Sequence, residues 1–147
     1  MFATIRSIMW RRKRVRRKRA STVTKHYVAH KEQARALVLE RLLHHNEHYQ
    51  LEWNRVAIRN QRRCWGSCSS LRNLNFSYRI LFLPAHLQDY IIVHEMCHLK
   101  EMNHGPNFWA LVAERLPHYR DLRSELRAYD RGLQQHWTVI DRVPERE

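Results

Sequence analysis

Glycine, proline and cysteine are scarce in this chain, and each scarcity narrows the chemistry that is expected of it. Among 147 residues there are three glycines and four prolines. A loop that wraps a nucleotide phosphate needs several glycines in close succession, so no glycine-rich phosphate loop is expected. The three cysteines are an odd number, which favours free thiols in a reducing compartment over a framework of disulfides.

Long apolar runs are also missing, so neither a secretory signal nor a transmembrane segment is expected. The first ten residues are mostly apolar, but Arg6 interrupts them and the cluster of charge follows them, whereas a signal begins with its charge. No stretch approaches the about 20 apolar residues that span a bilayer. The cytoplasm is the simplest assignment, although the arginine-rich start also has the composition of an organelle transit peptide.

Acidic residues are outnumbered, with 14 Asp and Glu against 27 Lys and Arg and a formal net charge of +13. Ten of the basic residues lie among the first 25, which contain no acid. Like charges at this density repel one another, so residues 1–29 are expected to form a flexible, solvated tail. The alternative is an arm that binds nucleic acid by counterion release. Its candidate contacts are Arg11, Arg12, Lys13, Arg14, Arg16, Arg17, Lys18 and Arg19.

The length predicts one domain, which we place at residues 30–133, followed by a C-terminal tail at residues 134–147. Apolar residues at helical spacing predict four helices, and alternating segments predict strands. The first helix is expected to pack across the sheet, and Gly132 to cap the last one. The expected helices cover residues 30–48, 84–98, 106–116 and 118–131, and the expected strands cover residues 54–59, 62–68 and 73–83.

Three histidines near the end of the first predicted helix, His44, His45 and His48, invite a metal-binding interpretation. Cations near the C-terminus of a helix are favourable against its dipole, and histidine is common there. We therefore interpret these three histidines as structural.

The segment 94–98, HEMCH, has the pattern of a zinc hydrolase. Two histidines four apart share one face of a helix, so both imidazoles reach one ion. Glu95 between them is placed to act as general base toward a water that the metal activates. The pattern predicts a catalytic site that holds one Zn²⁺ per chain, because a closed structural site usually contains cysteine.

A third protein ligand is needed, and two residues compete for that role. His104 lies six residues past His98, which requires the helix to end and the chain to turn back. Metzincins use this spacing with a glycine at the turn, whereas Glu101 stands here, so another residue such as Asn103 is expected to relieve the backbone. We favour His104 over the alternative, Glu114 on the following helix.

Trp65–Cys68 (WGSC), the predicted strand at residues 73–83 and the spacing HExxH-x5-H followed by Phe108 together resemble the YgjP-like metallopeptidase family, a relative of the SprT-like and WLM zinc proteases. The resemblance spans about residues 30–130. It implies a small zincin-like α+β domain with a short antiparallel or mixed sheet packed by helices. It also implies zinc ligands at His94, His98 and His104 and a catalytic role for Glu95.

Three functions follow from these patterns. The favoured one is a zinc metallopeptidase whose extended peptide substrate pairs with a strand edge near Trp65, Gly66 and Ser67. The second is a metal-dependent nucleoside triphosphate pyrophosphatase, since a member of the resembled family has been linked to pyrophosphate release from UTP. The third is a SprT-like protease that acts on proteins associated with nucleic acid, held there by the basic arm.

Overall fold

A three-stranded mixed sheet forms the centre of the computed structural model, which describes residues 22–140. Strands β1 (Arg55–Arg59), β2 (Gly66–Cys68) and β3 (Asn73–Ser77) lie in the order β1-β3-β2. β1 is parallel to β3, with Val56 opposite Leu74, whereas β2 is antiparallel to β3. β2 is therefore an edge strand, and one of its sides is not paired within the sheet.

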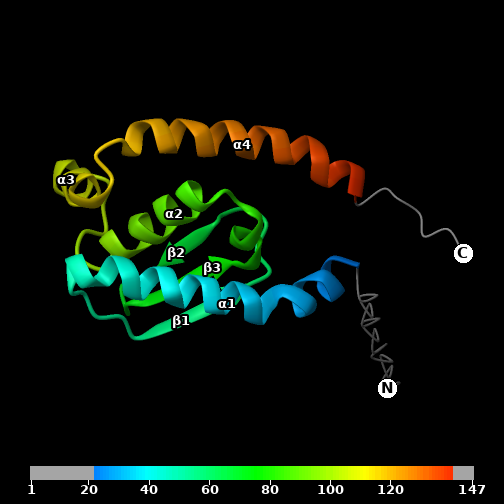
Figure 1. Cartoon of the computed structure of the whole chain (residues 1–147), viewed down its shortest axis with the longest axis horizontal. Helices are drawn as coiled ribbons and strands as arrows, with labels where there is room; N and C mark the ends of the chain where they lie inside the picture. Colours follow the sequence, from blue (N-terminus) through cyan, green and yellow to red (C-terminus); the bar gives the residue numbers. More distant parts are fainter. Residues whose placement is uncertain (1–21, 141–147) are drawn as a thin grey trace, which may run out of the picture.

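Together with this sheet, four α-helices within residues 22–140 confirm the α+β class. They are α1 (Thr22–Tyr49), α2 (Ala85–Cys97), α3 (Pro106–Arg115) and α4 (Tyr119–Ile140). α2 contacts α1, α3, α4 and β2, and Figure 1 shows it between α1 on one side and α4 on the other. Nine of its thirteen residues are buried. The helix that carries the HEMCH segment is thus the central element of the fold.

The core lies between α1, the sheet and α2. Ala34, Val38 and Leu42 follow one another at intervals of four on α1, and all three are fully buried. Leu74 and Phe76 alternate on β3 and are fully buried too. Burying a side chain of the size of Val, Leu or Phe contributes about 1.5–3 kcal/mol, so this face of α1 fixes the helix against the sheet.

The third predicted strand is shorter than expected. β3 ends at Ser77, and the chain continues as a 3₁₀ helix, η1 (Tyr78–Phe82). The Ser77 hydroxyl accepts a hydrogen bond from the backbone N–H of Arg79 at 3.4 Å and caps this helix. Tyr78, Arg79 and Ile80 are all buried, and three consecutive buried side chains cannot share one face of a strand.

Two helix boundaries also differ from the prediction. α1 begins at Thr22, eight residues before the predicted start, and the Tyr27 hydroxyl donates to the Ile58 carbonyl at 3.0 Å and ties this extension to β1. α4 continues through Gly132, because that glycine does not adopt the left-handed conformation of a C-cap. Among residues 22–140, no helix is long and apolar enough to cross a membrane. The predicted arm from Arg11 to Arg19 lies outside the described residues.

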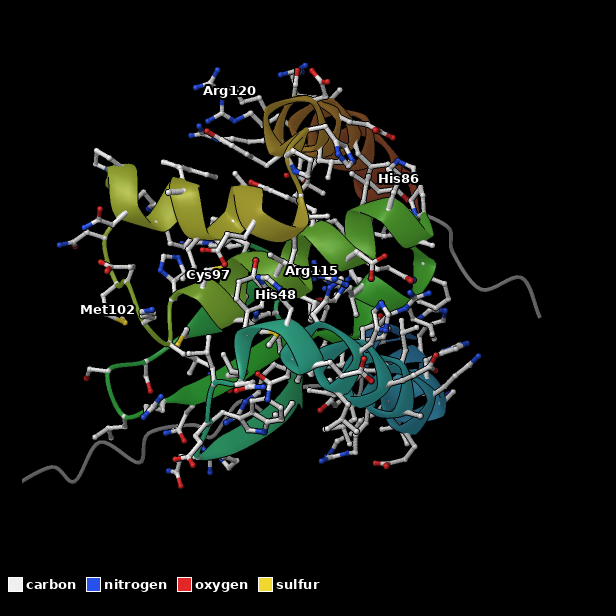
Figure 2. The ribbon with its side chains drawn as sticks, turned by 60° about the vertical axis from the view of Figure 1, so that its left-hand side comes forward. His48, His86, Cys97, Met102, Arg115 and Arg120 are labelled. Atoms are coloured by element: carbon white, nitrogen blue, oxygen red, sulfur yellow. The ribbon has the colours of Figure 1, made fainter. Side chains whose placement is uncertain are left out.

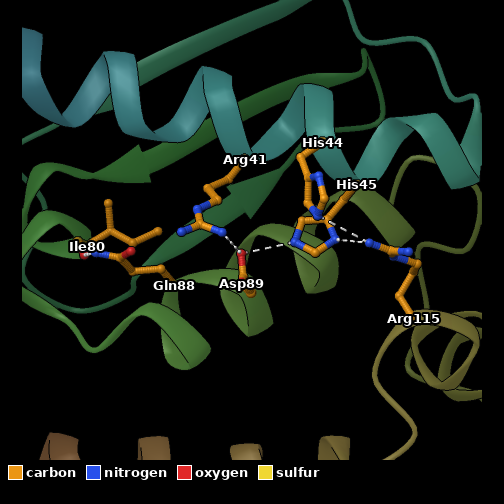
Figure 3. Close-up of polar contacts among 7 residues, drawn as sticks. All are labelled: Arg41, His44, His45, Ile80, Gln88, Asp89 and Arg115. Carbon is orange, nitrogen blue, oxygen red and sulfur yellow. Dashed lines mark hydrogen bonds and ion pairs between the residues drawn. The ribbon is translucent and has the colours of Figure 1, made fainter.

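A polar network joins α1, α2 and α3 (Figure 3). His45 is 4% exposed, and its Nε2 lies 3.0 Å from Asp89 Oδ1 on α2. Arg41 Nη1 lies 3.4 Å from the same oxygen, and Arg115 Nη2 of α3 lies 3.5 Å from His45 Nδ1. A neutral imidazole with its proton on Nε2 satisfies both contacts. These partners agree with the structural interpretation of His45.

Replacing Asp89 with alanine is expected to lower the free energy of unfolding by about 2 kcal/mol, because two cationic or polar partners lose their acceptor. Burial alone would raise the pKa of Asp89, but the hydrogen bond from His45 and the charge of Arg41 outweigh it and lower that pKa. The stabilisation is therefore present above the unfolded pKa of about 3.9 and is lost as the pH falls below it. Urea unfolding at pH 7 and at pH 3 measures both effects.

The matched control is Glu52→Ala, which removes an exposed carboxylate from the loop before β1. We expect its stability to stay within about 0.5 kcal/mol of the wild type. Equal losses in the two variants would show that the network contributes nothing specific.

Candidate metal centre and active site

Three imidazoles converge at the C-terminal end of α2. His94 lies in the last turn of the helix, and His98 is its C-cap residue. His94 Nε2 lies 3.2 Å from His98 Nε2 and 3.1 Å from His104 Nε2. An ion with tetrahedral Zn–N bonds of about 2.0–2.1 Å would hold its ligand atoms about 3.3 Å apart. Within the described part of the chain, this is the one cluster of three or more His, Cys, Asp or Glu side chains that could hold a metal ion.

The protonation state of these rings suits metal binding. His98 Nδ1 lies 2.9 Å from the Glu101 carbonyl, so it carries the proton and leaves the Nε2 lone pair free. Burial, with smaller contributions from His98 and His104, lowers the pKa of His94 to about 3. Burial likewise lowers the pKa of His98. Neutral imidazoles are the form that binds a metal ion.

An aromatic frame on α3 holds the three rings in place. The Phe108 ring is fully buried and stacks on His98 with centroids 4.5 Å apart. It also lies 5.0 Å from His94 and 4.9 Å from His104. Trp109 stacks on His104, with ring centroids 5.9 Å apart. The donors are therefore oriented by packing, which reduces the ordering that binding of an ion would require.

The turn that brings His104 back differs from the sequence expectation. α2 ends at Cys97, and the backbone N–H groups of Lys100 and Glu101 both donate to the Cys97 carbonyl. Between residues 22 and 140, the non-glycine residues with positive φ are Gln50 and Arg72. Asn103 is not among them, so the expected left-handed relief at this residue is wrong. A tight hydrogen-bonded turn reverses the chain instead.

Glu95 is buried beside β2. The residue is 7% exposed, and burial raises the pKa of its carboxyl group to about 8. A Cβ atom on Gly66 would lie only 2.8 Å from Glu95 Cγ. The backbone of β2 therefore packs directly on the carboxylate side chain, and glycine is the residue that permits this approach.

The structure distributes the predicted substrate residues around β2. Trp65 is half-buried, and its Nε1 donates to Asp130 Oδ1 on α4 at 2.7 Å. Gly66 contacts Glu95, whereas Ser67 is exposed and its hydroxyl accepts from Asn75 Nδ2 at 3.4 Å. The contact between Trp65 and α4 was missed by sequence reasoning, because the partners are 65 residues apart and no local pattern relates them.

The alternative ligand Glu114 does not join the cluster. Its Oε2 lies 2.9 Å from His48 Nε2, at the junction of α3 and α1. Figure 2 shows His48 on this side of α1. Glu114 is thus committed to a different partner, and His104 occupies the third position beside His94.

The three imidazole nitrogens are suitable ligands for the metal ion that metallopeptidases use. His94, His98 and His104 each offer one ring nitrogen, and these ligand atoms all lie within 4.8 Å of one another. Imidazole ligands suit zinc and several other divalent transition ions.

Comparisons with known proteins identify the family and the fold. A family model described as YgjP-like, metallopeptidase domain, matches residues 2–129. The fold is similar to the crystal structure of the metallopeptidase zymogen abylysin of Pyrococcus abyssi, with a TM-score of 0.57 and 21% identity, over 63% of this chain and 93% of that one. It is also similar to the zymogen jannalysin of Methanocaldococcus jannaschii, with a TM-score of 0.52 and 20% identity, over 65% and 95%.

Among curated proteins, none matches the sequence significantly. The two solved structures establish the fold, and the family model covers most of the chain. A metallopeptidase family implies a divalent metal, and the cluster of His94, His98 and His104 could hold one. On the strength of the match over residues 2–129, this chain belongs to the YgjP-like metallopeptidase family.

Proposed function

We propose that the chain is a zinc-dependent peptidase in which His94, His98 and His104 hold one Zn²⁺ and Glu95 is the general base. The observation that carries this proposal is the convergence of the three imidazoles, with Nε2 separations of 3.1 and 3.2 Å. Bound there, zinc would act as a Lewis acid that polarises the scissile carbonyl and activates a water molecule.

Glu95 transfers a proton from the attacking water to the leaving amine. In this role the carboxylate of Glu95, the residue after His94, accepts the proton of the attacking water. It then returns this proton to the nitrogen of the leaving amine. Burial keeps competing water away from the carboxylate, and a divalent cation nearby would favour its charged, basic form.

The free edge of β2 is the proposed place for an extended peptide. Added as a further antiparallel strand, the peptide would form main-chain hydrogen bonds with the segment from Trp65 to Ser67. Gly66 lies against Glu95, so a peptide on this edge would pass close to the general base.

The test is to incubate the zinc-loaded protein with a mixed peptide library and, separately, with nucleoside triphosphates, and to identify products by mass spectrometry. Peptide cleavage supports the proposal. Pyrophosphate release without cleavage would replace it with the nucleotide function that the family resemblance left open.

Replacing Gly66 with alanine is expected to lower kcat for peptide cleavage by about 100-fold, because the added Cβ displaces Glu95 from its working position. Zinc stoichiometry should stay at one, since the imidazoles are untouched. The control is Gly132→Ala on α4, where a Cβ meets nothing within 4 Å. This control should keep full activity and gain about 0.5–1 kcal/mol of stability. Equal activity in both variants would contradict the contact argument.

A further inference from the structure

One flank of α4 places cationic groups beside the metal centre. The guanidinium carbon of Arg123 lies 5.0 Å from the centroid of the Trp109 ring. That ring lies 5.9 Å from His104 and 6.0 Å from His94, measured between centroids. The Trp109 ring therefore contacts the Arg123 guanidinium and also lies close to the imidazoles of His94 and His104.

Arg127 follows one helical turn later and shares this flank, since residues four apart on a helix are neighbours. Burial raises the pKa of Tyr90, and the charges of Arg123 and Arg127 oppose that rise. Tyr90 precedes His94 by one turn of α2, with ring centroids 5.8 Å apart. Both charges therefore act on the ring of Tyr90, one turn of α2 before His94.

Within residues 25–132, no carboxylate forms an ion pair with Arg123 or Arg127. The ion pairs there involve other basic groups, among them Glu125 with His86 at 2.6 Å. Asp121 and Glu125 lie on the opposite flank of α4 by helical geometry. Asp130 accepts from Trp65 Nε1. Arg123 and Arg127 are both exposed, so they are accessible to an incoming anion.

α4 also links the metal centre to the substrate strand. Arg123 contacts Trp109 beside the imidazoles, and Asp130, two turns later, contacts Trp65 at the start of β2. Arg127 lies between these two points along the helix. Arg120, one turn before Arg123, lies at the N-terminal end of α4 (Figure 2) and contacts the Tyr119 ring. A peptide paired with β2 would therefore run beside Arg127 and Arg123 as it approaches the metal.

We propose that Arg123 and Arg127 form a subsite that binds a carboxylate of the peptide substrate, within one or two residues of the scissile bond. This inference rests on the proposed peptidase function. Each residue of an extended peptide advances by about 3.3 Å. The peptide residues next to the scissile bond would therefore reach past the Trp109 ring toward Arg123. The carboxylate comes either from an Asp or Glu side chain or from the C-terminus of a short peptide, and a guanidinium binds both in the same way.

The experiment uses the full-length, zinc-loaded protein and four versions of one cleaved peptide. They carry Glu or Gln next to the scissile bond, each with a free or an amidated C-terminus. The variants are Arg123→Gln and Arg127→Gln. The control is Arg55→Gln, which removes the same charge from β1, at the other edge of the sheet. Peptide binding is measured in parallel by fluorescence anisotropy in the Glu95→Gln background.

We expect the wild type to prefer the peptide with the recognised carboxylate by about ten-fold or more in kcat/KM, the factor that a hydrogen bond to a charged group supplies. Either arginine variant should lose most of this preference, while Arg55→Gln keeps it. The pair of peptides that shows the preference identifies the side chain or the C-terminus as its source. Anisotropy should show the same selectivity in binding.

Cleavage without any preference between the peptides, or a preference that survives in both arginine variants, would overturn this inference and leave the proposed function intact. If no peptide is cleaved, the peptidase proposal fails, and the binding measurement still decides whether the arginines select a carboxylate. Arginine variants that lose only triphosphate hydrolysis would assign the charges to a phosphate and overturn the carboxylate subsite.

Discussion

Replacing Glu95 with glutamine is expected to lower kcat for peptide cleavage by about 10³-fold, within the range that a positioned general base supplies. Glutamine keeps the shape of the side chain beside Gly66 but does not accept a proton. The three imidazoles remain in place, so the zinc content should equal that of the wild type. Measuring kcat and bound zinc on the same preparations separates loss of the base from loss of the metal.

Glu114→Gln is the matched control for this substitution. Glu114 is the other acid that the sequence offered as part of the site, and its carboxylate contacts His48 at 2.9 Å. The variant is expected to retain wild-type activity and zinc content. Wild-type turnover in Glu95→Gln, or loss of zinc in Glu114→Gln, would contradict the assignment of roles.

Glu95→Gln also measures how much the buried carboxylate lowers the stability of the folded protein. Burial raises the pKa of Glu95 to about 8 in the folded protein, against about 4.3 in an unfolded chain. The folded state then binds the proton more tightly, so the metal-free protein loses stability as the pH rises from about 4 to about 8. Metal-free Glu95→Gln should therefore unfold at a higher temperature than the wild type at pH 8 and at a similar one at pH 4.

α2 could be predicted from the sequence because the pattern that specifies it is local. The histidines at positions 94 and 98 are one helical turn apart, and the apolar residues around them specify a buried helix. The structure brings both imidazoles together with His104, as this spacing predicted. Strands were also expected at residues 54–59 and 73–83, since alternation is a local property of each strand, whereas the antiparallel or mixed sheet was implied by the family resemblance.

The parts that could not be read depend on contacts between distant segments. Nothing around Ser77 indicates that the strand ends there, because its capping role appears only when η1 packs into the core. Gly66 lies in the strand predicted at residues 62–68, and no local pattern indicates that it lets β2 approach Glu95. Trp65 pairs with Asp130 and Arg123 covers Trp109 only because α4 crosses α2. The proposed substrate contacts therefore depend on tertiary packing, whereas the spacing of the proposed metal ligands is a local property.

Removing the third imidazole by His104→Ala is expected to weaken zinc binding by well over the ~100-fold that loss of an outer-shell partner costs. His104 is exposed, so the metal-free variant should unfold within about 0.5 kcal/mol of the metal-free wild type. Adding zinc at 100 times its dissociation constant should stabilise the wild type by about 2.7 kcal/mol. The variant at the same zinc concentration should gain almost nothing, which thermal unfolding with and without a chelator measures.

His48→Ala provides the control for this experiment, since it removes another exposed histidine that contacts Glu114 and not the cluster. It should bind one zinc per chain and show the full stabilisation. The comparison is informative because the two variants differ in which site loses its imidazole and not in the kind of group lost. If both variants kept the stabilisation, zinc would bind without His104, and the three-histidine site would have to be replaced by one that uses other donors. If only His104→Ala lost it, the 3.1 Å contact between His104 and His94 would be explained by the ion that both nitrogens share.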